Sequence, residues 1–111
     1  MRRLLFNPLA QQPYAIGNYN QNKFVLDKPL EYGHIYYCVI YNEIERHQTS
    51  CFINTTYKAD TPITTPFNLH DIDGVNNIFC AKYMDNELII MDDNLTPTHN
   101  NDYVIYVYKL M

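Results

Sequence analysis

Residues 22–42, NKFVLDKPLEYGHIYYCVIYN, contain the pattern that decides the fold. In the first part the period is two, and Phe24 and Leu26 share one face, which is typical of a half-buried β-strand. Pro29 ends this strand, because proline cannot donate a hydrogen bond to a central ladder. Residues 35–41 are then apolar on both faces, rich in aromatic and β-branched side chains. This segment predicts a central strand that is covered on both sides.

Similar runs recur along the chain and predict an all-β fold. Residues 48–57, 78–84, 87–93 and 102–110 each predict a strand. Asp85-Asn86 supplies a hairpin turn between the strands predicted at 78–84 and 87–93. The segment 58–77 contains two prolines and predicts a long connection, with a short strand at 63–65. Without a helical stripe, six to eight strands favour an antiparallel β-sandwich of jelly-roll or Greek-key type.

The N-terminal residues predict an irregular arm over 1–22, followed by a single sandwich domain over 23–111. Two prolines break any helix before residue 14, and Gly17-Asn18 favours a turn. The arm is too apolar for a solvated tail, so we expect it to dock on its own domain or on a neighbouring subunit. Its apolar residues are Leu4, Leu5, Phe6 and Leu9.

Composition excludes several function classes. The net charge is −4, and no basic cluster exists beyond Arg2–Arg3, which disfavours a nucleic-acid partner. No signal peptide is recognisable and no apolar run reaches the roughly 18–20 residues of a membrane span. We therefore expect a protein made in a reducing cytoplasm, without membrane insertion. The odd number of cysteines predicts buried thiols and no disulfide framework; these are Cys38, Cys51 and Cys80.

A histidine is followed four residues later by a cysteine at two places, His34-x3-Cys38 and His47-x3-Cys51. On a strand such residues lie about 13 Å apart, at about 3.3 Å per residue, and cannot share a metal ion. A cross-strand site that joins Cys38 with Cys51 or His47 stays open. Mid-strand cysteines among apolar neighbours favour the neutral thiol over a catalytic thiolate. We expect no enzyme activity, no catalytic residue and no cofactor.

The loop DIDGVNN offers the best polar candidates for a binding site. Asp71 and Asp73 begin like a calcium-binding loop, but the fifth position is valine and the twelfth is lysine. Together with Asn76 and Asn77 they are candidates for a glycan-binding site. The alternative is an Asx-rich turn whose side chains hydrogen-bond the backbone.

Eleven tyrosines in 111 residues suggest that one sheet face meets another protein, where aromatic side chains are enriched. The rival interpretations are glycan binding and plain cross-strand pairing. We expect the oligomer interface to include three tyrosines together with the start of the arm. These residues are Tyr36, Tyr106, Tyr108, Leu4, Leu5 and Phe6.

The order F-x-L-D-K-P-L-x-Y-x-x-I-Y-Y over 24–37, with the terminal DYVIYVYKLM, resembles a module of tailed-phage structural proteins. Such modules are similar to the receptor-binding tips of tail fibres and head fibres. The resemblance implies a small antiparallel β-sandwich, usually with three copies around an axis. One departure is that Tyr108 is followed by Lys109, where the module has a closing Tyr-Gly.

On this resemblance we expect a structural virion protein of a tailed bacteriophage, such as a short fibre, a decoration protein or a tail adaptor. It would form a homotrimer, contact other virion proteins and contribute to attachment at a host-surface glycan. One alternative is a carbohydrate-binding module. A second alternative is a small phage-encoded inhibitor of a host protein, to which the cysteine–histidine spacing would belong.

Overall fold

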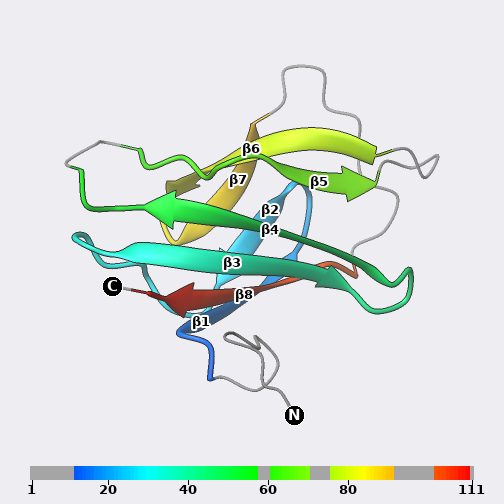
Figure 1. Ribbon diagram of the computed structural model, residues 1–111, viewed down its shortest axis with the longest axis horizontal. Helices are drawn as coiled ribbons and strands as arrows, with labels where there is room; N and C mark the ends of the chain where they lie inside the picture. The colour runs from blue at the N-terminus through cyan, green and yellow to red at the C-terminus, as the bar shows by residue number, and fades with distance from the viewer. Residues whose placement is uncertain (1–11, 58–60, 71–75, 92–101, 111) are drawn as a thin grey trace, which may run out of the picture.

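The computed structural model describes residues 12–57, 61–70, 76–91 and 102–110 (Figure 1). Within these ranges every regular element is a β-strand, and all neighbouring strands pair antiparallel. The expected all-β antiparallel class is confirmed. The strands are β1 Ala15–Tyr19, β2 Lys23–Leu26, β3 Ile35–Asn42, β4 His47–Asn54, β5 Phe67–His70, β6 Asn76–Met84, β7 Glu87–Met91 and β8 Val104–Lys109.

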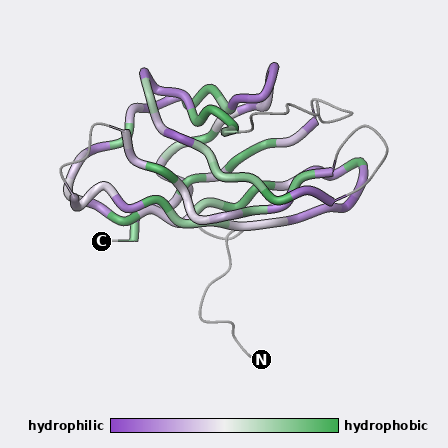
Figure 2. The backbone as a smooth tube through the Cα atoms, turned by 90° about the horizontal axis from the view of Figure 1, so that it is seen from above, coloured by the Kyte–Doolittle hydropathy of each residue, from purple (hydrophilic) through white to green (hydrophobic). Residues whose placement is uncertain are grey.

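The eight strands form one continuous sheet in the order β4-β3-β8-β1-β2-β7-β6-β5. The sheet folds over itself, so that β3, β4 and β8 form one layer and β2, β6 and β7 lie behind it (Figures 1 and 2). Its two ends meet where the amide of Thr65 donates to the carbonyl of Phe52 at 2.8 Å. The architecture is therefore a nearly closed, barrel-like sheet in two layers.

The core lies between the two layers and is filled by alternate residues of each strand. Phe24 and Leu26 of β2 are buried, whereas Val25 between them is 45% exposed, as the period of two predicts. Opposite them, β3 contributes three fully buried apolar side chains and β8 two. These are Tyr36, Cys38, Ile40, Ile105 and Val107.

The predicted arm over 1–22 is too long, because β1 lies within it. Gly17 does not form a turn: its position is a close approach between β1 and both neighbouring strands. A Cβ atom added there would lie 2.9 Å from Leu26 Cδ2 and 3.0 Å from Ile105 Cγ2. The turn comes later, at Gln21 and Asn22, whose φ angles are 52° and 66°.

The hairpin of β6 and β7 has the predicted form. β6 and β7 pair directly, and Asp85 and Asn86 between them have φ angles of 52° and 69°. Asparagine and aspartate tolerate this left-handed conformation better than most residues, which is why the dipeptide marks a tight hairpin.

The predicted connection over 58–77 contains β5, which the sequence pattern did not reveal. β5 has only four residues, FNLH, directly after Pro66, so its alternation is too short to stand out. Phe67 and Leu69 nevertheless bury their side chains in the core. The short strand expected at 63–65 is present only as isolated bridges, which join Thr64 to Ile53 and Ile63 to Lys82.

Candidate functional site

The second face of the β4-β3-β8-β1 layer carries an apolar patch centred on β3 and β8, whereas β4 presents Gln48, Ser50 and Asn54 on this face. The register sets Tyr37 of β3 beside Tyr108 and Phe52, and it sets Tyr106 of β8 between Val39 and Ile16. All these residues alternate with the core residues of their strands, so they point away from the core. We call this set the outer patch; it comprises Ile16, Tyr37, Val39, Phe52, Tyr106 and Tyr108.

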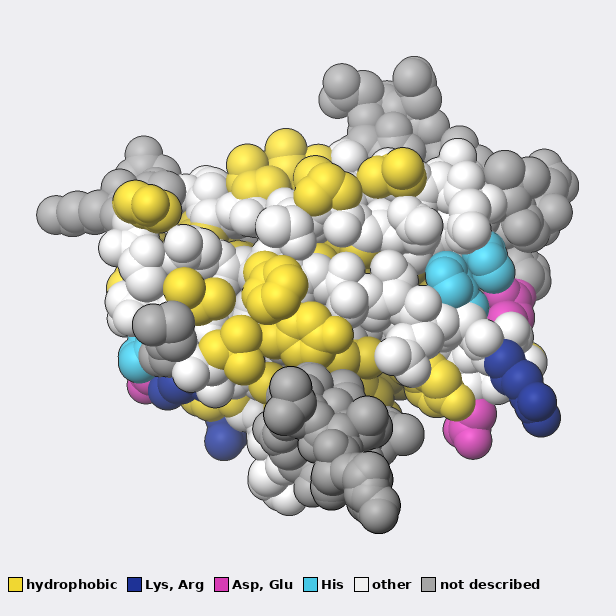
Figure 3. Space-filling view, viewed as in Figure 1, with side chains coloured by type: hydrophobic (Ala, Val, Ile, Leu, Met, Phe, Trp, Pro, Cys, Tyr) yellow, Lys and Arg dark blue, Asp and Glu magenta, His cyan; other side chains and the backbone are white. Residues whose placement is uncertain are grey.

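The outer patch is distinct from the core. Val39 and Tyr108 are only 3% and 4% exposed, yet neither belongs to the main core cluster. Burial raises the pKa of the Tyr108 phenol, and the neighbouring Tyr106 adds to this. Ile16 and Phe52 at the borders are 37% and 44% exposed. In Figure 3 hydrophobic side chains gather across the middle of the viewed face.

Aromatic side chains dominate this face, and they contact one another. The rings of Tyr37 and Phe52 lie 5.0 Å apart between centroids and are tilted by 49°. Such tilted pairs stabilise the face itself. A sheet face that only meets water is normally polar, so the outer patch is the candidate interaction surface of the described residues.

A shallow pocket of about 250 Å³ opens at one end of the outer patch. Tyr106 belongs to both, so the pocket and the patch are continuous. The pocket combines aromatic rings with two carboxylates, a set that suits a cationic group or a polyhydroxyl ligand. Its lining residues are Tyr41, Glu43, Ile44, Asp102, Val104 and Tyr106.

The expected interface residue Tyr36 does not lie on the outer face. Its side chain is fully buried in the core of its own domain. The Tyr36 hydroxyl accepts a hydrogen bond from the Glu31 amide at 2.9 Å, which satisfies the polar end of a buried ring. Tyr106 and Tyr108 do lie on the outer face. The prediction for Tyr36 is wrong because adjacent strand residues point to opposite faces.

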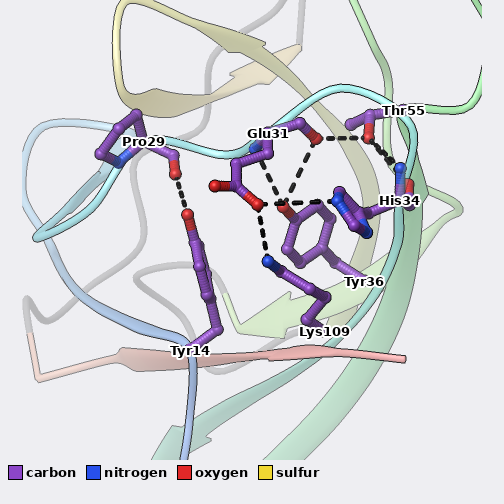
Figure 4. Close-up of polar contacts among 7 residues, drawn as sticks. All are labelled: Tyr14, Pro29, Glu31, His34, Tyr36, Thr55 and Lys109. Atoms are coloured by element: carbon purple, nitrogen blue, oxygen red, sulfur yellow. Dashed lines mark hydrogen bonds and ion pairs between the residues drawn. The ribbon is translucent and has the colours of Figure 1, made fainter. Parts of the chain in front are cut away.

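Tyr36 belongs to a polar network that holds the loop between β2 and β3 (Figure 4). The Thr55 hydroxyl lies 2.7 Å from the carbonyl oxygen of Glu31, and the Tyr14 hydroxyl donates to the Pro29 carbonyl at 2.5 Å. Lys109 Nζ lies 2.6 Å from the Glu31 carboxylate and holds the pKa of that carboxyl below its usual value. These contacts anchor the loop and have a structural role.

Of the other predicted site residues, the structure describes only Asn76 and Asn77. Leu4, Leu5, Phe6, Asp71 and Asp73 lie outside the described residues. Asn76 and Asn77 begin β6 and pair with His70 and Leu69 of β5. The two asparagines therefore take part in a hairpin ladder.

Two of the three cysteines lie directly opposite each other. Cys38 and Cys51 pair across β3 and β4, and both are buried free thiols, as predicted. A hydrogen bond with Cys51 and burial in the core raise the pKa of the Cys38 thiol well above its usual value. The neutral thiols therefore act as small core residues. Cys80 is a partly exposed free thiol.

A histidine pair, which the sequence pattern did not reveal, joins β4 to β5. The rings of His47 and His70 stack with centroids 4.0 Å apart and planes at 13°. His47 Nδ1 lies 2.9 Å from the Tyr103 hydroxyl, and His70 Nδ1 lies 3.2 Å from Glu45 Oε1. Burial, and then the charge of His70, lower the pKa of His47.

The histidine pair does not have the geometry of a metal centre. In-plane lone pairs of two parallel rings do not converge on one ion. Over the described ranges, no three histidine, cysteine, aspartate or glutamate side chains are placed to hold a metal. The stacked rings therefore form a link between two strands at the ends of the sheet.

No protein-family model, curated protein or solved structure matches this chain. The residues that the structure describes include no helix with the length and hydropathy needed to cross a bilayer.

Proposed function

We propose that this protein is a non-catalytic assembly subunit that associates with further copies of itself through the outer patch. The observation that supports it is the outer patch itself, an aromatic group on the face of β3 and β8 that does not fill the core. Water-exposed faces of antiparallel sheets are normally polar. A second copy would cover the exposed borders of the patch at Ile16 and Phe52.

The size of the outer patch suits this role. Aromatic side chains have a surface of about 150–250 Å² each and dominate interface energetics. A standard interface buries about 800 Å² on each partner, around a small group of aromatic anchors. Tyr37, Phe52 and Tyr106 can supply such a centre, and Ile16 extends it across β1.

The kind of assembly rests on the resemblance of residues 24–37 to tailed-phage fibre modules. On that basis we propose a structural virion protein, with three copies around an axis. The expected neighbours are other virion proteins.

The test is the solution mass of the full chain, measured by light scattering. We expect a multiple of the 13.2 kDa monomer mass. Tyr106→Lys places a charge at the centre of the outer patch and should shift the mass towards the monomer. The matched control is Tyr32→Lys, because Tyr32 is 63% exposed and lies in a loop. A wild-type chain that stays monomeric at micromolar concentration would falsify the proposal.

A second candidate function is glycan binding at the pocket. The rings of Tyr41 and Tyr106 can stack on a sugar, and the carboxylates of Glu43 and Asp102 can accept hydrogen bonds from its hydroxyl groups. Screening on a glycan array, with and without calcium, tests this function. A hit that Asp102→Ala abolishes supports it, and an array without hits removes it.

A further inference from the structure

We propose that the stacked His47–His70 pair is a proton-controlled closure between the two ends of the sheet. In the closed form the pair holds the start of β4 against the end of β5. A further proton on the pair separates these two strand ends, whereas the rest of the seam, the line along which β4 faces β5, stays closed. The device uses no residue of the outer patch and does not depend on the proposed function.

The seam is closed by different contacts along its length. At one end the backbone closes it, because the amide of Thr65 donates to the carbonyl of Phe52 at 2.8 Å. Farther along, the amide of Asn68 donates to the hydroxyl oxygen of Thr49 at 3.2 Å, so a side chain replaces the carbonyl of the facing strand. The described residues of β4 and β5 share no ladder at this point. The side-chain end can therefore open without breaking a strand pair.

The histidine pair closes the last part of the seam. His47 is the first residue of β4, and His70 is the last residue of β5. Their ring centroids lie 4.0 Å apart, and the amide of His70 donates to the Tyr103 hydroxyl at 3.1 Å. Each of these contacts depends on a titratable side chain, which makes this end of the seam sensitive to pH.

The Tyr103 hydroxyl determines where His47 carries its proton. This oxygen accepts from the His70 amide and lies 2.9 Å from His47 Nδ1. Its single hydrogen has Nδ1 as acceptor only when Nδ1 is unprotonated. Tyr103 is 1% exposed, and a buried donor without an acceptor is costly. The closed form therefore holds His47 neutral, with its proton on Nε2.

His70 has the opposite arrangement. Its Nδ1 lies 3.2 Å from Glu45 Oε1, and an ionised carboxylate only accepts hydrogen bonds. His70 Nδ1 therefore carries a proton and donates it. The side chains of His70 and Glu45 are 24% and 20% exposed, so protons from the solvent reach the pair. A positive charge on His70 faces a carboxylate at hydrogen-bond distance, whereas one on His47 faces the Tyr103 hydroxyl.

A further proton on His47 Nδ1 has two effects on the closed form. It turns the acceptor of the Tyr103 hydroxyl into a donor, and it places a cationic ring 4.0 Å from His70, which repels it when His70 is also protonated. In agreement with this geometry, burial and then the charge of His70 lower the pKa of His47. In the open form His47 meets water and takes up its proton at about pH 6.5. The closure is thus intact above about pH 6.5 and is lost as the pH falls towards the lowered pKa.

The titratable groups around the pair come from several elements. In the described part of the chain, Glu45 from the turn before β4 and Tyr103 from the segment before β8 face it. Tyr19 of β1 lies beside Tyr103, with ring centroids 6.1 Å apart. Arg46, which precedes His47, is exposed. Glu45 opposes the opening, because its charge raises the pKa of His47 in the closed form.

Amide hydrogen exchange of the full chain, followed by NMR at pH 7.5 and at pH 5.0, tests the inference. The amides of Asn68 and His70 report on the side-chain end of the seam, and the amide of Thr65 reports on the backbone end. Protection factors remove the direct effect of pH on the exchange chemistry. At pH 5.0 we expect those of Asn68 and His70 to fall about tenfold or more and that of Thr65 to stay within about threefold.

Two variants identify the histidines as the cause. His47→Gln offers the Tyr103 hydroxyl an amide oxygen that takes up no proton, and His70→Gln removes the ring that repels a charged His47. We expect the loss of Asn68 protection at pH 5.0 to disappear in the first variant and to shrink in the second. If one variant does not fold, the other still decides. The matched control is His34→Gln, in the loop before β3, which should keep the response of the wild type.

Several results would overturn the inference. The amides of Asn68 and His70 could be unprotected at pH 7.5, or equally protected at both pH values. A parallel loss at Thr65 would mean that the whole sheet unfolds. A loss that persists unchanged in both glutamine variants would belong to other groups, and the stacked rings would then be a structural link only. None of these results bears on self-association, which light scattering tests separately.

Discussion

The two faces of β3 have similar composition and different surroundings. Tyr36, Cys38 and Ile40 point into the core and are fully buried. Tyr37 and Val39 point away from it, and neither belongs to the core cluster. The core face meets a second layer of the same chain, whereas the outer face lies outside the core cluster although Val39 and Tyr108 are buried there as well. An apolar strand face thus indicates a contact but does not say which molecule provides it.

The largest expected difference between the two faces concerns two adjacent tyrosines. Tyr36→Ala should lower the free energy of unfolding by about 3–5 kcal/mol, because it removes a buried ring and leaves a cavity. Tyr37→Ala should lower it by about 1 kcal/mol or less, since its ring is partly exposed. Urea unfolding at one fixed protein concentration measures both.

Equal losses for the two tyrosine variants would contradict the assignment of the faces. A loss for Tyr37→Ala that grows with protein concentration would instead reveal its contribution to association.

A smaller difference is expected on β1, where Gly17 and Asn18 lie on opposite faces. Gly17→Ala adds a Cβ atom that would lie 3.0 Å from the carbonyl oxygen of Val25 and as close to core side chains. We expect a loss of about 1–3 kcal/mol from overpacking. Asn18→Ala, at an exposed position in the same strand, should change stability by less than about 0.5 kcal/mol.

Thermal unfolding compares these two variants on β1. If Gly17→Ala were as stable as the wild type, β1 would not pack between β2 and β8 as closely as described.

The smallest expected effect is a pH dependence at the end of the sheet. Burial lowers the pKa of His47, and the charge of His70 lowers it further, whereas Glu45 raises it. The folded state therefore binds fewer protons than the unfolded state, in which a histidine has a pKa of about 6.5. The stability that neutral His47 contributes is full above about pH 6.5 and is lost as the pH falls towards the lowered pKa.

Unfolding midpoints between pH 8 and pH 5 test the contribution of His47. His47→Gln should flatten the decline at low pH, and His34→Gln, in the loop before β3, serves as the control. Glu45, His70 and Tyr103 are the titratable groups that face His47. An unchanged decline in His47→Gln would assign it to other groups.

The sequence predicts most strands, because alternation and double-sided apolar runs are local signals. It does not predict β1, since Gly17 marks a turn in most sequences and is here a close contact between strands. β5 is also missed, since four residues are too few to show a period. The His47–His70 pair depends on where β5 lies, so it could not be inferred without that strand.

The same limit applies to the candidate site. The tyrosine content predicts an aromatic face, and Tyr106 and Tyr108 lie on the outer face, where their part in an oligomer interface stays a prediction. Tyr36 does not lie on the outer face. A strand that is apolar on both faces gives no local sign of which face turns inward. That choice follows from the pairing of β3 with β4 and β8. The pocket also depends on how the strands pair, because its lining residues come from the segment after β3 and from the start of β8.

The meeting of the two ends of the sheet also constrains how copies can join. The amide and carbonyl of Phe52 on β4 are both engaged by Thr65, and Thr49 accepts from the amide of Asn68. An open edge would invite a foreign strand to extend the ladder, which is the usual route to amyloid-like stacking. At these positions the edge is already occupied. The association that we propose would therefore use side chains on a sheet face and not the strand edge at these positions.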